Sequence, residues 1–144
     1  MFMDDVSNAG AIPMLEKVLA FTEARNRMLA ENIANVTTPG YRAKQLDVHG
    51  FQSALREAFD KRAAAGGRVD VRSGEQISTD SGGRLRVNPT QEPAENLLFH
   101  DGTNARIERE MANLAENAMM HQAATELTRV YFDGLKKAIS GRVV

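Results

Sequence analysis

The sequence predicts a mainly α-helical and elongated protein. An N-terminal and a C-terminal amphipathic helix would pair as in a coiled coil, joined by an extended, irregular middle segment with room for a small β-hairpin. Three observations predict this fold class. Apolar residues recur at spacings of three and four over residues 12–36 and again over residues 105–140, as on one face of a helix. Glycine and proline cluster between these stretches, over residues 63–104.

The composition narrows the classes of function. The chain has 144 residues, a net charge of −1 and no cysteine. Acids and bases are interspersed, so we expect no nucleic-acid partner. No stretch approaches the ~20 apolar residues that cross a bilayer, and the early acids Asp4 and Asp5 do not suit a cleavable signal peptide. By these rules the protein is cytoplasmic and does not insert into a membrane, unless a dedicated apparatus exports it.

The N-terminal helix is predicted over residues 12–36. Residues 1–11 show no period and are predicted to be a mobile start, and Pro13 suits a first helical turn. The predicted helix-packing residues here are Ile12, Leu15, Leu19, Leu29 and Ile33. Thr22 and Asn26 occupy the intervening positions of this row, and a second row contains Met14, Val18, Phe21 and Met28. The apolar face is therefore wider than a two-helix seam, which fits either a small bundle or contact with several neighbours.

A turn is predicted where this helix ends. Asn35 and Thr38 have short polar side chains that compete with helical backbone hydrogen bonds. Pro39 keeps the residue before it out of the helical region, and Gly40 supplies the positive φ that a type II turn needs at its third position. Tyr41 then resumes an extended path.

The middle of the chain is predicted in three pieces. Residues 37–50 form the turn and an exposed extended segment, and residues 51–62 place apolar side chains at the spacing of a short helix. Residues 63–104 are a Gly- and Pro-rich insert and linker. Within it, Arg68–Arg72 and Arg84–Val87 are β-prone runs that fit a small hairpin or a flexible insert.

The C-terminal helix, over residues 105–140, is the longest ordered element predicted. Asp101–Asn104 supplies residues that start helices. A helix of about 35 residues would be roughly 50 Å long, which a chain of this size cannot cover by itself. The predicted helix-packing residues here are Ile107, Met111, Leu114, Leu127, Tyr131, Phe132, Leu135 and Ile139. Additional chains are expected to cover this face.

No group of residues favours catalysis or a cofactor. His49, His100 and His121 are isolated, without other metal ligands at a suitable spacing. The glycine pairs lack the strand and helix context of a phosphate loop, and the helix carboxylates have basic neighbours with which to pair. We therefore expect neither an enzyme nor a metal or cofactor site.

Six residues form the pattern Asn-X-X-Asn-X-X-Thr-Pro-Gly-Tyr: Asn32, Asn35, Thr38, Pro39, Gly40 and Tyr41. This pattern resembles the signature of bacterial flagellar axial proteins. The stretch MLAENIANVTTPGYRAKQL, and later FHDGTN followed by EREMANLAENAMMHQ, are similar to a proximal rod subunit of the basal body. The resemblance covers nearly all of the chain. Val48-His49 departs from it, since an aromatic residue is expected after Asp47.

The resemblance implies a structural, non-enzymatic subunit that self-assembles into the hollow rod serving as the drive shaft for motility. The paired terminal helices would form its inner wall. It also implies export through the flagellar type III apparatus without a cleaved signal, and a periplasmic location. The implied partners are copies of the chain, other rod subunits, and export-gate or adaptor proteins at the rod base. The residues alone leave an alternative open, a cytoplasmic coiled-coil adaptor that binds a partner helix.

Overall fold

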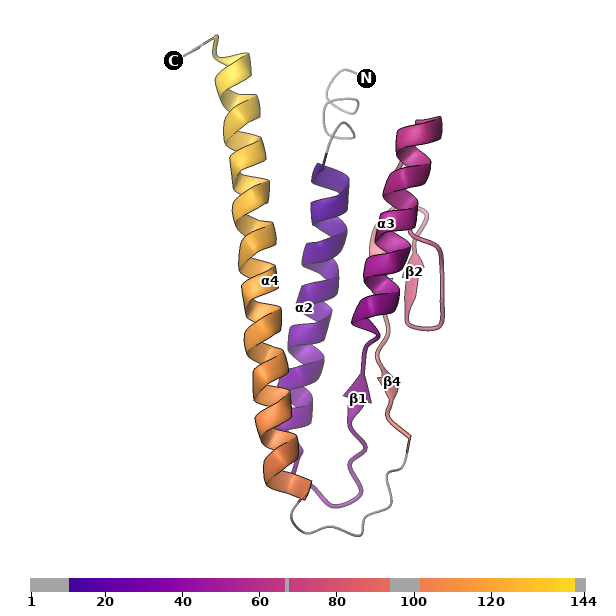
Figure 1. The fold of residues 1–144 in the computed structure, drawn as a ribbon, viewed down its shortest axis with the longest axis vertical. Coiled ribbons are helices and arrows are strands. Elements are labelled where there is room, and N and C mark those ends of the chain that lie inside the picture. The colour runs from indigo at the N-terminus through magenta and orange to yellow at the C-terminus, as the bar shows by residue number, and fades with distance from the viewer. Residues whose placement is uncertain (1–10, 67, 94–101, 142–144) are drawn as a thin grey trace.

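The structure is a computed structural model that describes residues 11–66, 68–93 and 102–141. Three helices run along the long axis of the molecule, and α2 lies between α3 and α4 (Figure 1). The elements in chain order are α2 (Ile12–Ala34), β1 (Lys44–Gln45), α3 (Val48–Ala65), β2 (Ile77–Thr79), β3 (Leu85–Val87), β4 (Thr90–Gln91) and α4 (Gly102–Ile139). The predicted fold class, two long helices with a small hairpin between them in sequence, is confirmed.

The two sides of α2 contact different elements, which explains its wide apolar face. On one side Phe21 stacks on Phe51 of α3, with ring centroids 3.9 Å apart and parallel planes. Further buried members of this core are Leu55, Ala58, Val69 and Val71. On the other side α2 packs against α4 in an antiparallel direction, since Thr22 contacts His121 whereas Asn32 contacts Glu110. The helix therefore has neighbours within its own chain on both sides.

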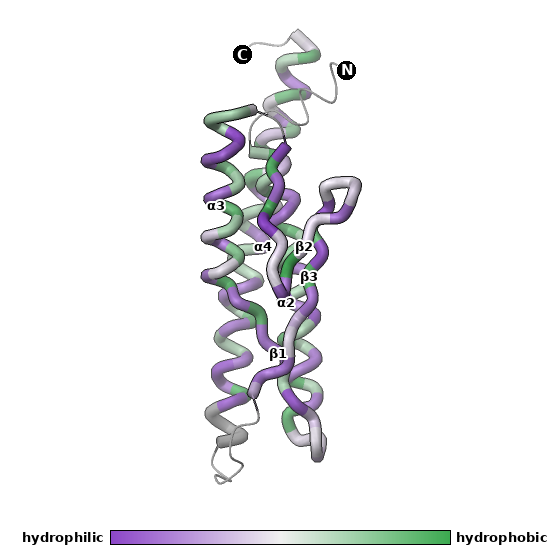
Figure 2. The backbone as a smooth tube through the Cα atoms, turned by 90° about the vertical axis from the view of Figure 1, so that its right-hand side faces the viewer, coloured by the Kyte–Doolittle hydropathy of each residue, from purple (hydrophilic) through white to green (hydrophobic). Residues whose placement is uncertain are grey.

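The hairpin forms between neighbouring strands rather than between the two predicted runs. β2 pairs with β3 in register Ile77↔Val87, and β1 pairs with β4 in register Lys44↔Gln91. The segment 68–72 was expected to supply a strand, but it is extended without strand pairing, and its two valines enter the core. Asp80 favours the pairing of β2 with β3, because its carboxylate accepts the backbone N–H groups of Gly82 and Arg84 and closes a tight turn between them. Figure 2 shows α3 and the hairpin together on one side of α2.

Helix limits differ by a few residues from the predicted ones. α2 ends two residues before the predicted residue 36. α3 begins at Val48 rather than at residue 51 and continues to Ala65. The earlier start follows from Asp47, whose side chain accepts the Gly50 N–H as an N-cap. Ala43 is buried, so the predicted exposed segment before α3 is partly in the core.

The length of α4 exceeds what α2 can cover. α4 has 38 residues and α2 has 23, or about 57 Å and 35 Å. The C-terminal turns of α4 extend beyond the first turn of α2 (Figure 1). Among the helices described, none is long and apolar enough to cross a bilayer. The predicted mobile start over residues 1–10, His100 and Asp101 lie outside the described residues.

Candidate assembly interface

Asn32 connects the end of α2 to both β1 and α4. Its Oδ1 accepts the Lys44 backbone N–H at 2.9 Å and the Tyr41 hydroxyl at 3.0 Å. Its Nδ2 donates to the Lys44 carbonyl at 2.8 Å and to Glu110 Oε2 at 3.3 Å. The Ala43 carbonyl accepts the N–H of Glu92, the residue after β4. The N–H and carbonyl of Lys44 therefore face away from β4, and the Asn32 amide pairs with both, as a neighbouring strand would. The side chain is only 4% exposed.

The remaining motif residues form one continuous turn. Asn35 accepts the Thr38 backbone N–H on its carbonyl at 2.9 Å, and Thr38 accepts the Tyr41 N–H at 3.2 Å. Gly40 has φ +75°, as the third position of a type II turn requires. Because the Tyr41 hydroxyl returns to Asn32, the turn is tied to the helix that it follows. The predicted turn residues therefore lie together in space.

Charged side chains around this turn stabilise the same backbone path from α2 to β1. Lys44 Nζ lies 2.7 Å from Glu31 Oε1, and this hydrogen bond raises the pKa of Lys44 above its ordinary value. Partial burial, followed by the negative charge of Glu31, raises the pKa of Tyr41. The phenol therefore stays protonated and keeps its donor for Asn32. Arg106 of α4 pairs with Glu92 at 2.8 Å, which ties the start of α4 to the end of β4.

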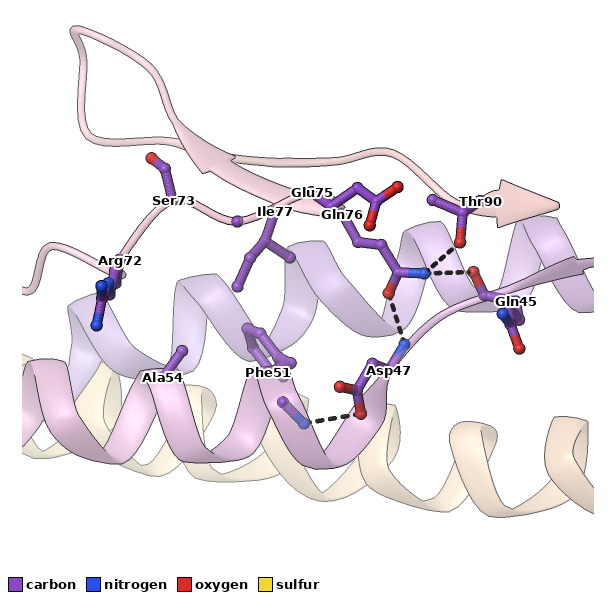
Figure 3. A pocket seen from close by; sticks show the side chains of 12 residues that line it. Gln45, Asp47, Phe51, Ala54, Arg72, Ser73, Glu75, Gln76, Ile77 and Thr90 are labelled. Carbon is purple, nitrogen blue, oxygen red and sulfur yellow. Dashed lines mark hydrogen bonds between the residues drawn. The ribbon is translucent and has the colours of Figure 1, made fainter. Parts of the chain in front are cut away.

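Gln76 joins the two small sheets. Its Oε1 accepts the Asp47 N–H at 2.7 Å, while its Nε2 donates to the Gln45 carbonyl at 3.2 Å and to Thr90 Oγ1 at 2.6 Å (Figure 3). The side chain thus continues the ladder between β1 and β4, at the point where Asn88 turns away to pair with the Gln76 carbonyl. An open hollow of about 500 Å³ beside it is lined by polar loop residues over the ring of Phe51. These contacts position the hairpin on α3.

The seam between α2 and α4 is polar at its centre. Thr22 Oγ1 lies 2.8 Å from His121 Nδ1, and Asn117 Nδ2 donates to the Thr22 carbonyl at 2.8 Å. Arg25 reaches Glu116 at 3.4 Å. Within the described residues, the buried atoms Arg25 Nη1 and Asn117 Oδ1 have no hydrogen-bond partner. Such atoms lower stability, so this seam is held less firmly than the apolar core on the other side of α2.

The predicted helix-packing residues fall into three groups. Those buried inside the subunit are Ile12, Leu15 and Leu29. Those that are half-buried are Leu19, Ile33, Ile107, Leu114 and Leu135. Those that are exposed are Met111, Leu127, Tyr131, Phe132 and Ile139. In the single chain, each residue of the last group is at least 42% exposed to solvent.

Sequence reasoning missed the buried row of α4. The buried positions are Glu110, Asn117 and Ala124, seven residues apart, whereas the apolar pattern favoured Met111. On α2, Arg25 is buried where Asn26 was expected in the row. The spacing of seven residues was visible in the sequence, but two of the three residues are polar, and a search for apolar residues overlooks such a row.

Large apolar side chains remain exposed along α4. They are Met111 (55%), Met119 (67%), Leu127 (53%), Val130 (65%), Tyr131 (42%), Phe132 (54%) and Ile139 (75%). Met119, Leu127 and Val130 share one side of the helix, away from the buried row, and we call these three residues the uncovered face of α4. Soluble monomers rarely expose so many large apolar side chains on one element, and such surfaces mark interaction sites. In the described part of the chain, no cluster of His, Asp or Glu is placed to hold a metal ion.

Gly40→Val is expected to lower the free energy of unfolding by about 1–3 kcal/mol, because a β-branched residue resists positive φ. A Cβ at Gly40 would meet no atom within 4 Å, so backbone strain and not a clash causes the loss. Urea unfolding followed by circular dichroism measures it. Gly134→Ala, also in open space but inside α4, should instead gain up to about 1 kcal/mol. Equal stability of Gly40→Val and the unmodified protein would show that the turn only connects two elements.

The fold is that of an elongated, mainly helical protein whose longest helix is incompletely covered. A scan against models of known families finds no match. Individual proteins do match, and all three below are flagellar basal body rod proteins FlgB. The chain is 29% identical to that of Bacillus subtilis over 133 residues, covering 92% of this chain and 95% of the relative. It is 30% identical to that of Yersinia enterocolitica over 126 residues, covering 83% and 84%. It is 31% identical to that of Cereibacter sphaeroides over 127 residues, covering 87% and 90%.

The chain belongs to the family of flagellar basal body rod proteins FlgB. It is thus a structural protein of the flagellar rod, and the resemblance carried by the Asn32–Tyr41 motif is confirmed.

Proposed function

We propose that the chain self-assembles through its long helices into the hollow proximal rod, the drive shaft of the flagellum. The observation that carries this proposal is the uncovered face of α4. Burial of one large apolar side chain contributes about 1.5–3 kcal/mol, so covering several of them supplies a strong drive to associate. The names of the relatives support the rod as the place of assembly.

The uncovered face of α4 also indicates which partners the chain would have. Copies of the chain and other rod subunits would cover the uncovered face, and export-gate or adaptor proteins would contact the subunits at the rod base. The turn at Thr38–Tyr41 would direct the hairpin and α3 away from the helical wall. We also propose that the chain is exported to a periplasmic rod without a cleaved signal. The contacts of Asn32 support the proposed direction of the turn, because its side chain holds both α4 and the segment that leaves the turn.

Leu127→Asp is expected to prevent assembly while the subunit stays folded. Leu127 is 53% exposed in the subunit, so the charge remains solvated there. In a dry contact with another helix, the same charge would cost about 3 kcal/mol or more, which weakens that contact roughly 100-fold. Rod formation is measured by electron microscopy of basal bodies from cells that carry only the variant.

Gln122→Asp is the matched control, because Gln122 is an exposed polar residue of the same helix. It should leave both assembly and the circular dichroism spectrum unchanged. Normal rods built from Leu127→Asp subunits would overturn the proposal for this face.

A further inference from the structure

Met119 exposes a thioether on the uncovered face of α4. It is 67% exposed, more than any other methionine in the described ranges. Ala115 and Ala123 lie four residues before and after it, so they share its side of the helix, and both are exposed. Leu127 and Val130 continue the same face towards the C-terminus of α4. None of these side chains forms hydrogen bonds, so this row of α4 is apolar.

The composition makes methionine the side chain that a peroxide attacks most readily, because the chain contains no cysteine whose thiolate would compete. Among the described methionines, Met28 is 5% exposed, and Met14 and Met120 are half-buried. Met111 is 55% exposed, but it lies about 160° around the helix from Leu127, outside the uncovered face. Met111 therefore provides a comparison, an accessible thioether on a different side of α4.

We propose that hydrogen peroxide oxidises Met119 of the free subunit to its sulfoxide, and that this reversible modification keeps the subunit out of the rod. The inference rests on the proposed function and deepens it, because it assigns a chemical control to the surface through which the subunit assembles. The thioether is open to solvent before assembly, and Ala115 and Ala123 beside it have no group that could pair with an added oxygen.

The oxidation transfers one oxygen atom. The sulfur lone pair of Met119 attacks one oxygen of the peroxide, an S–O bond forms, and the O–O bond breaks. The departing oxygen takes up the proton of the attacked oxygen and leaves as water, so the thioether loses the two electrons that the peroxide gains. Two thiols of a methionine sulfoxide reductase reverse the step and yield the thioether, a disulfide and water.

The added oxygen changes what the surface can bury. A sulfoxide oxygen is a strong hydrogen-bond acceptor, which water satisfies while α4 is uncovered. In a dry contact with a neighbouring helix the oxygen would lose its water, and this loss would weaken the contact. Once the contact has formed, the neighbour shields the thioether from the oxidant. Free subunits are therefore sensitive to peroxide, whereas subunits in the rod are protected.

The first measurement tests accessibility in the full-length protein. The purified subunit is treated with hydrogen peroxide, and mass spectrometry of its peptides follows the sulfoxide at each methionine. We expect Met119 and Met111 to be oxidised at least about tenfold faster than Met28, because only Met28 is buried. A Met119 that reacts no faster than Met28 would overturn the inference.

The second measurement counts rods by electron microscopy of basal bodies from cells that carry one form of the chain. The chain is induced with or without hydrogen peroxide, at a dose that oxidises most free subunits at position 119. We expect peroxide to lower the count at least about fivefold for the unmodified chain and for Met111→Leu, but less than about twofold for Met119→Leu. The same loss in all three strains, or no loss with the unmodified chain, would contradict the inference.

A third comparison needs no oxidant. Glutamine resembles the sulfoxide in length and polarity, so Met119→Gln should give at least about fivefold fewer rods than Met119→Leu. Equal counts for these two variants would also rule the inference out. If Leu127→Asp subunits build normal rods but Met119→Leu protects assembly from peroxide, the inference stands and the proposed function fails. If Leu127→Asp blocks rods but peroxide affects the Met119→Leu and unmodified strains alike, only the inference fails.

Discussion

Phe21→Ala is expected to lower the free energy of unfolding by about 3–5 kcal/mol, the usual cost of removing a buried phenylalanine. Phe21 is 1% exposed and stacks on Phe51. Its core includes Val69 and Val71, so the ring joins α2 to both α3 and the segment before the hairpin. Single domains have only about 5–15 kcal/mol of stability, so this variant should be close to unfolding at 37 °C.

Urea unfolding followed by circular dichroism at 25 °C measures the loss. Phe59→Ala on α3 is the matched control, because Phe59 is 41% exposed and its removal should cost less than about 1 kcal/mol. The double variant with Phe51→Ala should cost less than the sum of the two single variants, by about 0.5–1.5 kcal/mol for the lost ring pair. Equal losses for Phe21→Ala and Phe59→Ala would mean that the stacked pair does not organise the core.

Asn32→Ala is expected to cost about 2–4 kcal/mol, although alanine suits a helix better than asparagine does. The loss arises because the Lys44 N–H and carbonyl and the Tyr41 hydroxyl lose a partner beside α2. Glu110, 4% exposed, would also lose its contact with Nδ2. Amide hydrogen exchange at Lys44 should accelerate together with the loss of stability.

Two further variants separate this role from helix propensity. Asn26→Ala, at an exposed position of α2, should change stability by no more than about 0.5 kcal/mol. Asn32→Asp keeps the acceptor for Tyr41 but removes the donor and adds a carboxylate near Glu110. Its stability relative to Asn32→Ala should therefore rise as the pH falls, because protonation removes the repulsion and restores a donor. An Asn32→Ala variant as stable as Asn26→Ala would contradict the role of Asn32.

The long helices and the turn could be predicted because their determinants are local. Residues three and four apart set the helix faces, and Pro39 with Gly40 sets the turn within four residues. The register of the hairpin was harder to predict from the sequence. The alternation over Arg68–Arg72 resembles a strand as closely as Ile77–Thr79 does, and only the turn at Asp80 selects the partner of β3.

The contacts that build the interface could not be predicted, because their partners are distant in sequence. Gln76 is an ordinary polar residue until the fold brings the Asp47 N–H to it, 29 residues away. Asn32 belonged to the recognised motif, yet nothing local indicated that Glu110, 78 residues away, would share its amide. Side-chain amides that pair with backbone groups leave no periodic signal in a sequence.

A density map of the subunit within an assembled rod tests most directly whether other subunits cover the uncovered face of α4. We expect Leu127 and Val130, 53% and 65% exposed in the single chain, to be buried against helices of neighbouring subunits. The Thr38–Tyr41 turn should lead the hairpin away from that helical wall. A map in which Leu127 and Val130 face solvent, and neighbours contact only the hairpin and α3, would contradict the account.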